Sequence, residues 1–192
     1  MDIVHKVIAV KRIFRNFSAE ENKFLRKVKI SCLPGCRYCC TNPDLMAYPL
    51  EFFPYAWHLY EEVRAEEIYH SLEQTDCNLC ILYNPVQPQG GCMEYTYRGL
   101  ICRLFGFSRT TGRNNESRLF TCRIIKNNYI HLFDRIKNDP GMVDKAPLTT
   151  EYYSLLRAID PMGCNELLPI NSAIQKAIEA VGLYFLYRKT KS

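Results

Sequence analysis

The chain has 192 residues, a formal net charge of +5 and a hydrophobic fraction of 47%, which suffices for one domain over 1–192 with its own core. Its mild basicity, without a Lys/Arg run interleaved with aromatic residues, argues against a nucleic-acid-binding protein. The start lacks a secretory signal pattern and no run of about 18 apolar residues occurs, so we expect a cytoplasmic protein that does not bind or span a membrane.

The first predicted element is a helix over residues 1–30. Ser18-Ala19-Glu20-Glu21 has the spacing of a capping box, and an apolar stripe follows it. Pro34-Gly35 interrupts the helical pattern and indicates a loop. That loop carries the first group of cysteines.

A long helix is predicted over residues 49–74, because large apolar side chains recur there at helical spacing. Pro49 suits its first turn, although Pro54 could mark the true start, since the residue before a proline avoids helical backbone angles. Residues 76–116 are rich in Asn, Pro, Gly and Cys, so we expect a ligand-bearing loop there rather than regular structure.

Three further helices are predicted in the second half of the chain. One covers 118–137 and ends at Asp139-Pro140-Gly141. A short one has Thr150 as its cap, and a last one runs from Asn171, again as the cap, to about 188.

No segment shows the alternation of apolar and polar residues that is typical of a strand. The expected fold class is therefore mainly α, a single helical domain with an irregular cysteine-rich loop layer that carries a metal or iron–sulfur site. The cysteine-rich region covers about 30–125, and a helical C-terminal part covers about 145–190.

Cysteine is the chemically informative residue of this chain, which contains ten of them. Cytoplasmic thiols are kept reduced, so grouped cysteines are more typical of a metal site than of disulfides. The candidate ligands fall into two groups, the first from 32 to 40 and the second from 80 to 122. They are Cys32, Cys36, Cys39, Cys40, Cys80, Cys92, Cys102 and Cys122.

Eight thiolates allow one or two centres, because tetrahedral zinc and a four-iron cluster each take four. Cys77 is an alternative to Cys80, since Cys77-Asn78-Leu79-Cys80 is itself a C-x-x-C pair. Cys164 lies far from both groups in sequence and is expected to pack as a small hydrophobe. The four histidines occur singly and are not expected to be ligands.

The two groups resemble the signatures of the YkgJ-type cysteine-cluster family, a zinc- or iron-chelating domain. The first signature, C-x-x-C-C with a cysteine upstream, is matched by Cys36-Arg37-Tyr38-Cys39-Cys40 and Cys32. The second is matched by Cys80-Ile81-Leu82-Tyr83, by Cys92-Met93-Glu94-Tyr95-Thr96-Tyr97-Arg98-Gly99-Leu100-Ile101-Cys102-Arg103 and by Cys122.

The resemblance has three implications for single residues. It selects Cys80 over Cys77 as a ligand. It matches Glu51 to a glutamate on the helix that follows the first signature. A role outside the metal's ligand shell, or as a general base, competes there with that of a first-turn carboxylate stabilised by the helix dipole. It also shows one departure, because Gly99 stands where the family commonly has proline.

Three functions are compatible with these signatures. The first is a protein that holds an iron–sulfur cluster or zinc through two groups of cysteines. The family is similar to the cysteine-rich part of flagellin lysine N-methylases, which implies as an alternative the transfer of a methyl group from S-adenosylmethionine to a lysine of a protein substrate. No glycine-rich loop for that donor is visible. The third is a structural zinc module that presents helices to a partner protein.

Arginines also lie close to the cysteines in sequence. Their guanidinium groups could compensate the negative charge of a thiolate-bound centre and donate hydrogen bonds to sulfur. The alternative is pairing with surface carboxylates, which we favour for Arg37 and Arg123 and leave open for Arg98 and Arg103.

Overall fold

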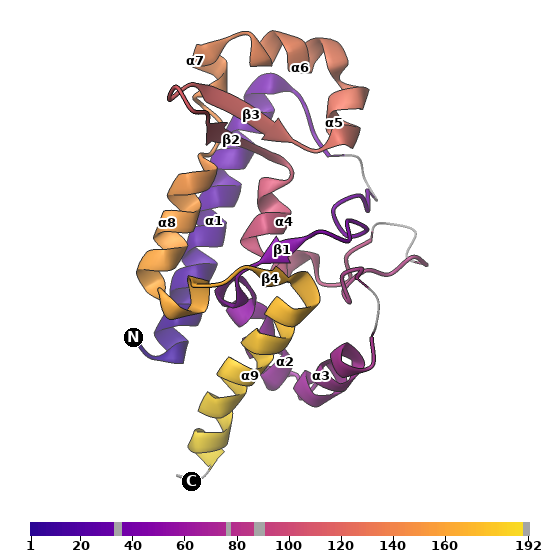
Figure 1. The fold of residues 1–192 in the computed structure, drawn as a ribbon, viewed down its shortest axis with the longest axis vertical. Helices are drawn as coiled ribbons and strands as arrows, with labels where there is room; N and C mark the ends of the chain where they lie inside the picture. Colours follow the sequence, from indigo (N-terminus) through magenta and orange to yellow (C-terminus); the bar gives the residue numbers. More distant parts are fainter. Residues whose placement is uncertain (33–35, 76–77, 87–90, 190–192) are drawn as a thin grey trace.

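A computed structural model describes residues 1–32, 36–75, 78–86 and 91–189 (Figure 1). Helices dominate the described residues, which confirms the expected mainly α class. They are α1 (Ile3–Val28), α2 (Phe53–Glu61), α3 (Ala65–Glu73), α4 (Leu100–Leu104), α5 (Arg123–Asn128), α6 (Ile130–Lys137), α7 (Pro140–Val143), α8 (Thr149–Ile159) and α9 (Ile170–Lys189). Short 3-10 turns are η1 (Pro49–Phe52), η2 (Tyr95–Tyr97) and η3 (Met162–Cys164).

The structure also contains short strands that no alternating pattern in the sequence indicated. Strands β2 (Phe107–Thr111) and β3 (Ser117–Thr121) form an antiparallel hairpin, and the short β1 (Met46–Ala47) pairs with β4 (Leu168–Pro169). The hairpin turn contains Asn115 in the left-handed region, with φ of 59°. These strands are too short for an alternating pattern to stand out, and β2 lies in a segment whose composition is that of a loop.

The helix predicted over 49–74 is in fact three elements, η1, α2 and α3. The break between α2 and α3 is at Val63, whose φ of 58° is left-handed. A β-branched residue rarely adopts this conformation, so nothing in the sequence marks the turn as a glycine would.

The helix predicted over 118–137 begins later and is interrupted. Residues 117–121 form β3, α5 begins at Arg123, and Tyr129, with φ of −127°, separates α5 from α6. The end at Lys137 is close to the predicted one, and Asp139 caps the next helix, α7, by accepting a hydrogen bond from the Met142 N–H at 3.1 Å.

The predicted helix caps were also misplaced. The segment 18–21 lies inside α1, whose cap is Asp2, with a carboxylate that accepts from the His5 N–H at 2.9 Å. Thr150 and Asn171 lie in the first turns of α8 and α9 rather than before them. Helix α1 therefore runs unbroken through the predicted start signal, because its buried apolar face continues on both sides of it.

Two hydrophobic clusters share α1. The N-terminal half of α1 packs with α2, α8 and α9, and its C-terminal part packs with the β2–β3 hairpin and with α5, α6 and α7. In Figure 1, α2, α3 and α9 accordingly lie toward one end of α1, and the hairpin with α5–α7 lies at the other. Among the described helices, none is both long and apolar enough to cross a membrane.

Candidate metal centre

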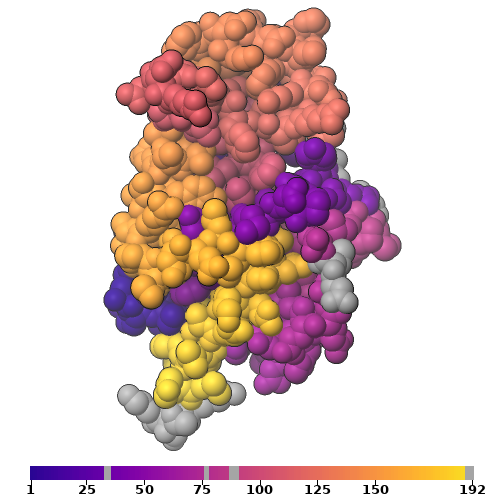
Figure 2. Space-filling model, in the orientation of Figure 1, coloured from indigo at the N-terminus to yellow at the C-terminus, as the bar shows by residue number. Residues whose placement is uncertain are grey.

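The two cysteine-bearing loops, one after α1 and one after α3, touch each other. The Arg37 guanidinium donates to the Pro85 carbonyl at 2.7 Å. A Cβ built on Gly91 would lie 2.8 Å from the Arg37 Cβ, so only glycine permits this approach next to Cys92. Figure 1 shows both loops on the same side of the molecule, and in Figure 2 their surfaces adjoin.

Cys40 lies at the middle of one set of thiols. Its Sγ is 4.0 Å from the Sγ of Cys39, and it also hydrogen-bonds with the thiol of Cys92. These two contacts raise the pKa of Cys40, while the bond with Cys40 lowers the pKa of Cys39 to about 6 and also lowers that of Cys92. Cys40 therefore keeps its proton, while the thiolate forms of Cys39 and Cys92 are favoured.

Two further thiols face this set. Burial, together with the charges of Cys92 and Cys39, raises the pKa of Cys80 to about 12. Burial also raises the pKa of Cys102, with Cys80 and Cys39 adding to the effect. Cys102 comes from α4 and Cys80 from the loop after α3, so residues distant in sequence are brought together.

A second set consists of Cys32, Cys36 and Cys122. Burial, then the charge of Cys36 and a hydrogen bond with its thiol, raise the pKa of Cys32 to about 12, and Cys122 and Cys39 contribute. Cys122 is the N-cap of α5 and is itself influenced by Cys36 and Cys39. Cys39 interacts with members of both sets, so the eight predicted ligands form one connected group.

Cys164 is separate from this group. It is buried in η3, where burial and the charges of Glu51 and Asp160 raise its pKa to about 12. Cys77 lies outside the described residues, so the choice between it and Cys80 stays a prediction. As the described side chains are placed, no three His, Cys, Asp or Glu residues surround a point that could hold a metal ion.

Backbone N–H groups point at several of these sulfurs. Cys80 accepts from Leu82, Cys92 accepts from Glu94, and Cys122 accepts from the Ile125 N–H at 3.5 Å. At each of the three, the hydrogen bond lowers the pKa of the thiol. A donor aimed at sulfur stabilises the thiolate, which is the form that binds metal.

Arg98 acts electrostatically on three of the eight clustered cysteines. Its charge adds to the hydrogen bond with Cys40 in lowering the pKa of Cys39 and of Cys92, and it opposes the effect of burial at Cys102. Its guanidinium stacks 3.5 Å from the ring centre of Tyr95 and donates to the Tyr95 carbonyl, which holds it beside the cysteine loop. For Arg98 the structure therefore favours charge compensation over a surface ion pair.

Arg103 has a different role, that of bracing the loop between Cys92 and Cys102. It donates to the carbonyls of Thr96 at 2.8 Å and Arg98 at 3.2 Å, and to the Ser18 hydroxyl of α1 at 3.2 Å. Its guanidinium also stacks on Phe14, 4.7 Å from the ring centre. Arg37 likewise supports a loop, through the bond to Pro85 rather than through a surface carboxylate.

Glu51 is buried and bonds to two backbone segments. Its carboxylate accepts from the N–H of Tyr48, the N-cap of η1, at 2.9 Å, and from the Ile101 N–H in the first turn of α4 at 2.8 Å. Burial raises its pKa to about 7, although the backbone hydrogen bonds oppose this. Because Cys102 follows Ile101, Glu51 positions the helical turn that carries a predicted ligand.

Gly99 lies where a side chain would meet two neighbouring residues. A Cβ at this position would lie 2.9 Å from the Phe52 Cζ and 3.1 Å from the Glu51 Oε2. The missing side chain lets Glu51 reach the N-terminus of α4, where Gly99 is the N-cap and has no capping side chain of its own.

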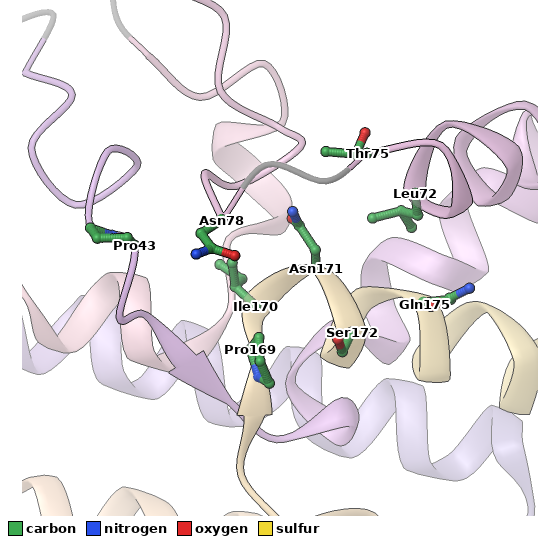
Figure 3. Close-up of a pocket in the computed structure, with 9 residues that line it drawn as sticks. All are labelled: Pro43, Leu72, Thr75, Asn78, Pro169, Ile170, Asn171, Ser172 and Gln175. Carbon is green, nitrogen blue, oxygen red and sulfur yellow. The ribbon is translucent and has the colours of Figure 1, made fainter.

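Asn171 ties the second cysteine loop to α9, a role that sequence reasoning missed. Its side chain accepts from the Ile81 N–H and donates to the Leu79 carbonyl, both at 2.8 Å. A cavity of about 280 Å³ lies beside these contacts (Figure 3). Its lining contains no cysteine among the described residues and consists of Pro43, Leu72, Thr75, Asn78, Pro169, Ile170, Asn171, Ser172 and Gln175.

Comparison with protein-family models, with curated proteins and with solved structures found no significant match for this chain. The resemblance to the YkgJ-type family therefore stays a prediction that rests on the cysteine spacing. The chemistry of the site has to be argued from its own residues.

Proposed function

We propose that this chain binds a zinc ion or an iron–sulfur cluster through the group of eight cysteines. The observation that carries the proposal is their convergence. The loop after α1, the loop after α3, helix α4 and the N-cap of α5 each contribute thiols to one connected network. Buried thiols that serve only as small hydrophobes have no reason to gather from four segments around each other.

The donor set defines the class of metal. Thiolates are soft ligands that suit zinc, copper(I) and iron–sulfur clusters, whereas magnesium and calcium prefer oxygen. Eight thiols allow two centres, with the set around Cys40 and the set around Cys122 as their natural division and Cys39 available to either. When bound, the group would supply positive charge for the thiolates and, if it is an iron–sulfur cluster, an electron-transfer site.

Protons must leave when the metal binds. Cys39, whose pKa lies at about 6, is the sulfur most ready to be a thiolate at neutral pH, whereas Cys32 and Cys80 are neutral thiols. Metal binding to the thiols of Cys32 and Cys80 releases their protons to solvent, so the metal affinity of the protein rises with pH. Arg98 then offsets part of the negative charge that accumulates.

Purification without oxygen tests this proposal. Protein prepared in this way is expected to carry iron with acid-labile sulfide, or zinc, at one or two centres per chain. Thiol titration should show the clustered cysteines protected until a chelator removes the metal. A metal-free protein that is fully folded, with all of these thiols reacting freely, would refute the proposal.

A bound metal would also stabilise the arrangement of the segments that it joins. This supports a structural contribution of the kind expected for a zinc module, whether or not the centre performs redox chemistry. Methyl transfer from S-adenosylmethionine rests on the family resemblance alone, because no contact among the described residues specifically favours a binding site for that donor.

A further inference from the structure

The positive charge of this chain is concentrated at one end of the molecule, here called the basic end. It consists of residues 21–30 of α1 and residues 107–146, which include the β2–β3 hairpin and α5–α7 and pack around one hydrophobic cluster (Figure 1). Lys and Arg outnumber Asp and Glu there by twelve to five, which gives a net charge of +7. Because the whole chain has +5, the remaining residues together carry −2.

The cations of the basic end lie on its surface and have few carboxylate partners. Ten of the twelve are exposed, and of these ten only Arg118 forms an ion pair with a described residue, Glu116. Other carboxylates of this end are engaged by the chain itself, since Asp139 caps α7 and Asp144 accepts from the Ser117 hydroxyl. Surface charge of one sign that the protein does not neutralise attracts a partner of the opposite sign.

The fold gathers some of these cations from distant parts of the sequence. Lys27 of α1 contacts Lys145, which follows α7, and this contact and the charge of Lys145 lower the pKa of Lys27. Lys23 acts on Lys27 in the same direction. These three residues form the lysine cluster. Ammonium groups repel one another, so an anion bound between them relieves the repulsion.

The hairpin adds an exposed aromatic ring to the basic end. Phe120 of β3 is 39% exposed, and the exposed Arg118 lies two positions before it, on the same face of the strand. The ring of Phe105 packs edge-on against Phe120, with 5.8 Å between the ring centres. A cationic surface with an exposed ring suits a single strand of nucleic acid, whose phosphates meet the cations and whose bases stack on the ring. An acidic protein segment has the charge but no base.

We propose that the basic end binds single-stranded RNA or DNA, with phosphates at the lysine cluster and a base stacked on Phe120. No run of Lys and Arg marks this site in the sequence, because the fold assembles it from two segments. Binding here involves no cysteine, so the inference is independent of the proposed metal centre.

The experiment measures the binding of fluorescently labelled oligouridylate and oligothymidylate of equal length to protein purified without oxygen, at several salt concentrations. The first variant combines Lys23→Gln, Lys27→Gln and Lys145→Gln. If the three side chains contact phosphates, its affinity at about 0.1 M salt falls about a hundredfold, because each contact with a single strand releases about 0.7 of a counterion. The slope of log affinity against log salt falls by about two.

Two further variants test the place and the kind of contact. The matched control combines Lys11→Gln, Arg12→Gln and Arg15→Gln, which removes the same charge from exposed positions of α1 outside the basic end. Its affinity should stay close to that of the wild type. Phe120→Leu keeps an apolar side chain against Phe105 but removes the stacking surface, so it should weaken binding about tenfold without changing the salt dependence.

Weaker binding in the lysine-cluster variant and in Phe120→Leu, but not in the control, would support the inference, and comparison of the two oligonucleotides shows whether RNA or DNA is preferred. Equal loss in the control and the lysine-cluster variant would overturn it, because net charge alone would then explain binding. So would wild-type affinity in Phe120→Leu, or binding of a polyglutamate peptide or of anionic lipid vesicles as tight as that of the oligonucleotides.

Discussion

Cys39 is the residue at which the two sets of thiols meet. It contacts Cys40 and influences Cys32, Cys80, Cys102 and Cys122 electrostatically. Loss of the Cys39 thiol should therefore reduce metal binding more than loss of a thiol at the edge of the group, such as that of the exposed Cys32.

Replacing Cys39 by serine is expected to cut metal retention sharply, because a hydroxyl is a poor ligand for soft metals. Cys32→Ser should retain more metal than Cys39→Ser, and Cys164→Ser should match the wild type. Metal per chain, measured after anaerobic purification, decides among these. Equal loss in all three variants would show that folding, rather than ligation, is affected.

Arg98 offers a test of charge compensation. Arg98→Gln removes the cation that lowers the pKa of Cys39 and Cys92, so we expect about tenfold weaker metal binding. Arg118→Gln is the control, since Arg118 is exposed on the β2–β3 hairpin and pairs with Glu116 rather than acting on the cysteines. Chelator competition measures both, and equal affinities for the two variants would argue against a special role of Arg98.

The raised pKa of Glu51 predicts that the stability of the metal-free protein depends on pH. Its pKa is raised from 4.5 to about 7 in the folded state, chiefly by burial. The folded protein therefore holds this proton more tightly than the unfolded chain does. The stabilisation is fully present below pH 4.5 and is lost as the pH rises through about 7.

The loss attributed to Glu51 amounts to about 3 kcal/mol. Glu51→Gln does not titrate, so the free energy of unfolding of the wild type minus that of Glu51→Gln should shrink by up to this amount as the pH is raised from 4.5 to above 7. Denaturant unfolding at several pH values measures it. A difference that does not change with pH would contradict the assignment.

Some of these residues could be predicted from the sequence because their pattern is local, and others could not because their role depends on the fold. Cysteines at short spacing can be recognised in the sequence, because few other residue types can take the place of a thiolate as a metal ligand. Glu51 was found only through the family resemblance. The separate roles of Arg98 and Arg103, and the lysine cluster, depend on contacts between distant segments, which local spacing does not encode.

At the scale of elements, long helices could be predicted from their apolar periodicity, whereas turns and short strands could not. Helices α1 and α9 were found with ends within a few residues of those observed, because many residues share their signal. The break at Val63 and the β2–β3 hairpin were missed, since a left-handed valine and strands of five residues leave no local signature. Tertiary packing decides such segments.

Metal removal should affect these elements unequally. Residues 76–116 were expected to be one loop, but α4 and β2 within it carry buried side chains, among them Leu100, Leu104 and Phe107. Chelation should therefore make 78–98 sensitive to protease, whereas cleavage within 100–111 stays slow and most of the helical circular dichroism persists.

Limited proteolysis with mass spectrometry, on metal-loaded and chelated protein side by side, locates the cuts. Cleavage spread evenly over 78–111 would contradict this division. Complete loss of the helical signal would show that both hydrophobic clusters depend on the metal.

At the scale of the whole molecule, the cysteine group lies where the two hydrophobic clusters meet. Cys80 belongs to the cluster that contains α2 and α9, and Cys122 belongs to the one that contains the hairpin and α5. Thiolates from both sides bound to a common centre would couple the two ends of α1. We propose that sulfur alone, drawn from both clusters, holds a metal.

X-ray absorption spectroscopy of the anaerobically purified protein, at the edge of whichever metal it carries, tests that claim most directly. We predict a nearest shell made of sulfur, with metal–sulfur distances of about 2.3 Å and about four sulfurs around each metal. A nearest shell of nitrogen or oxygen at about 2.0–2.1 Å, or the absence of any stoichiometric metal, would contradict it.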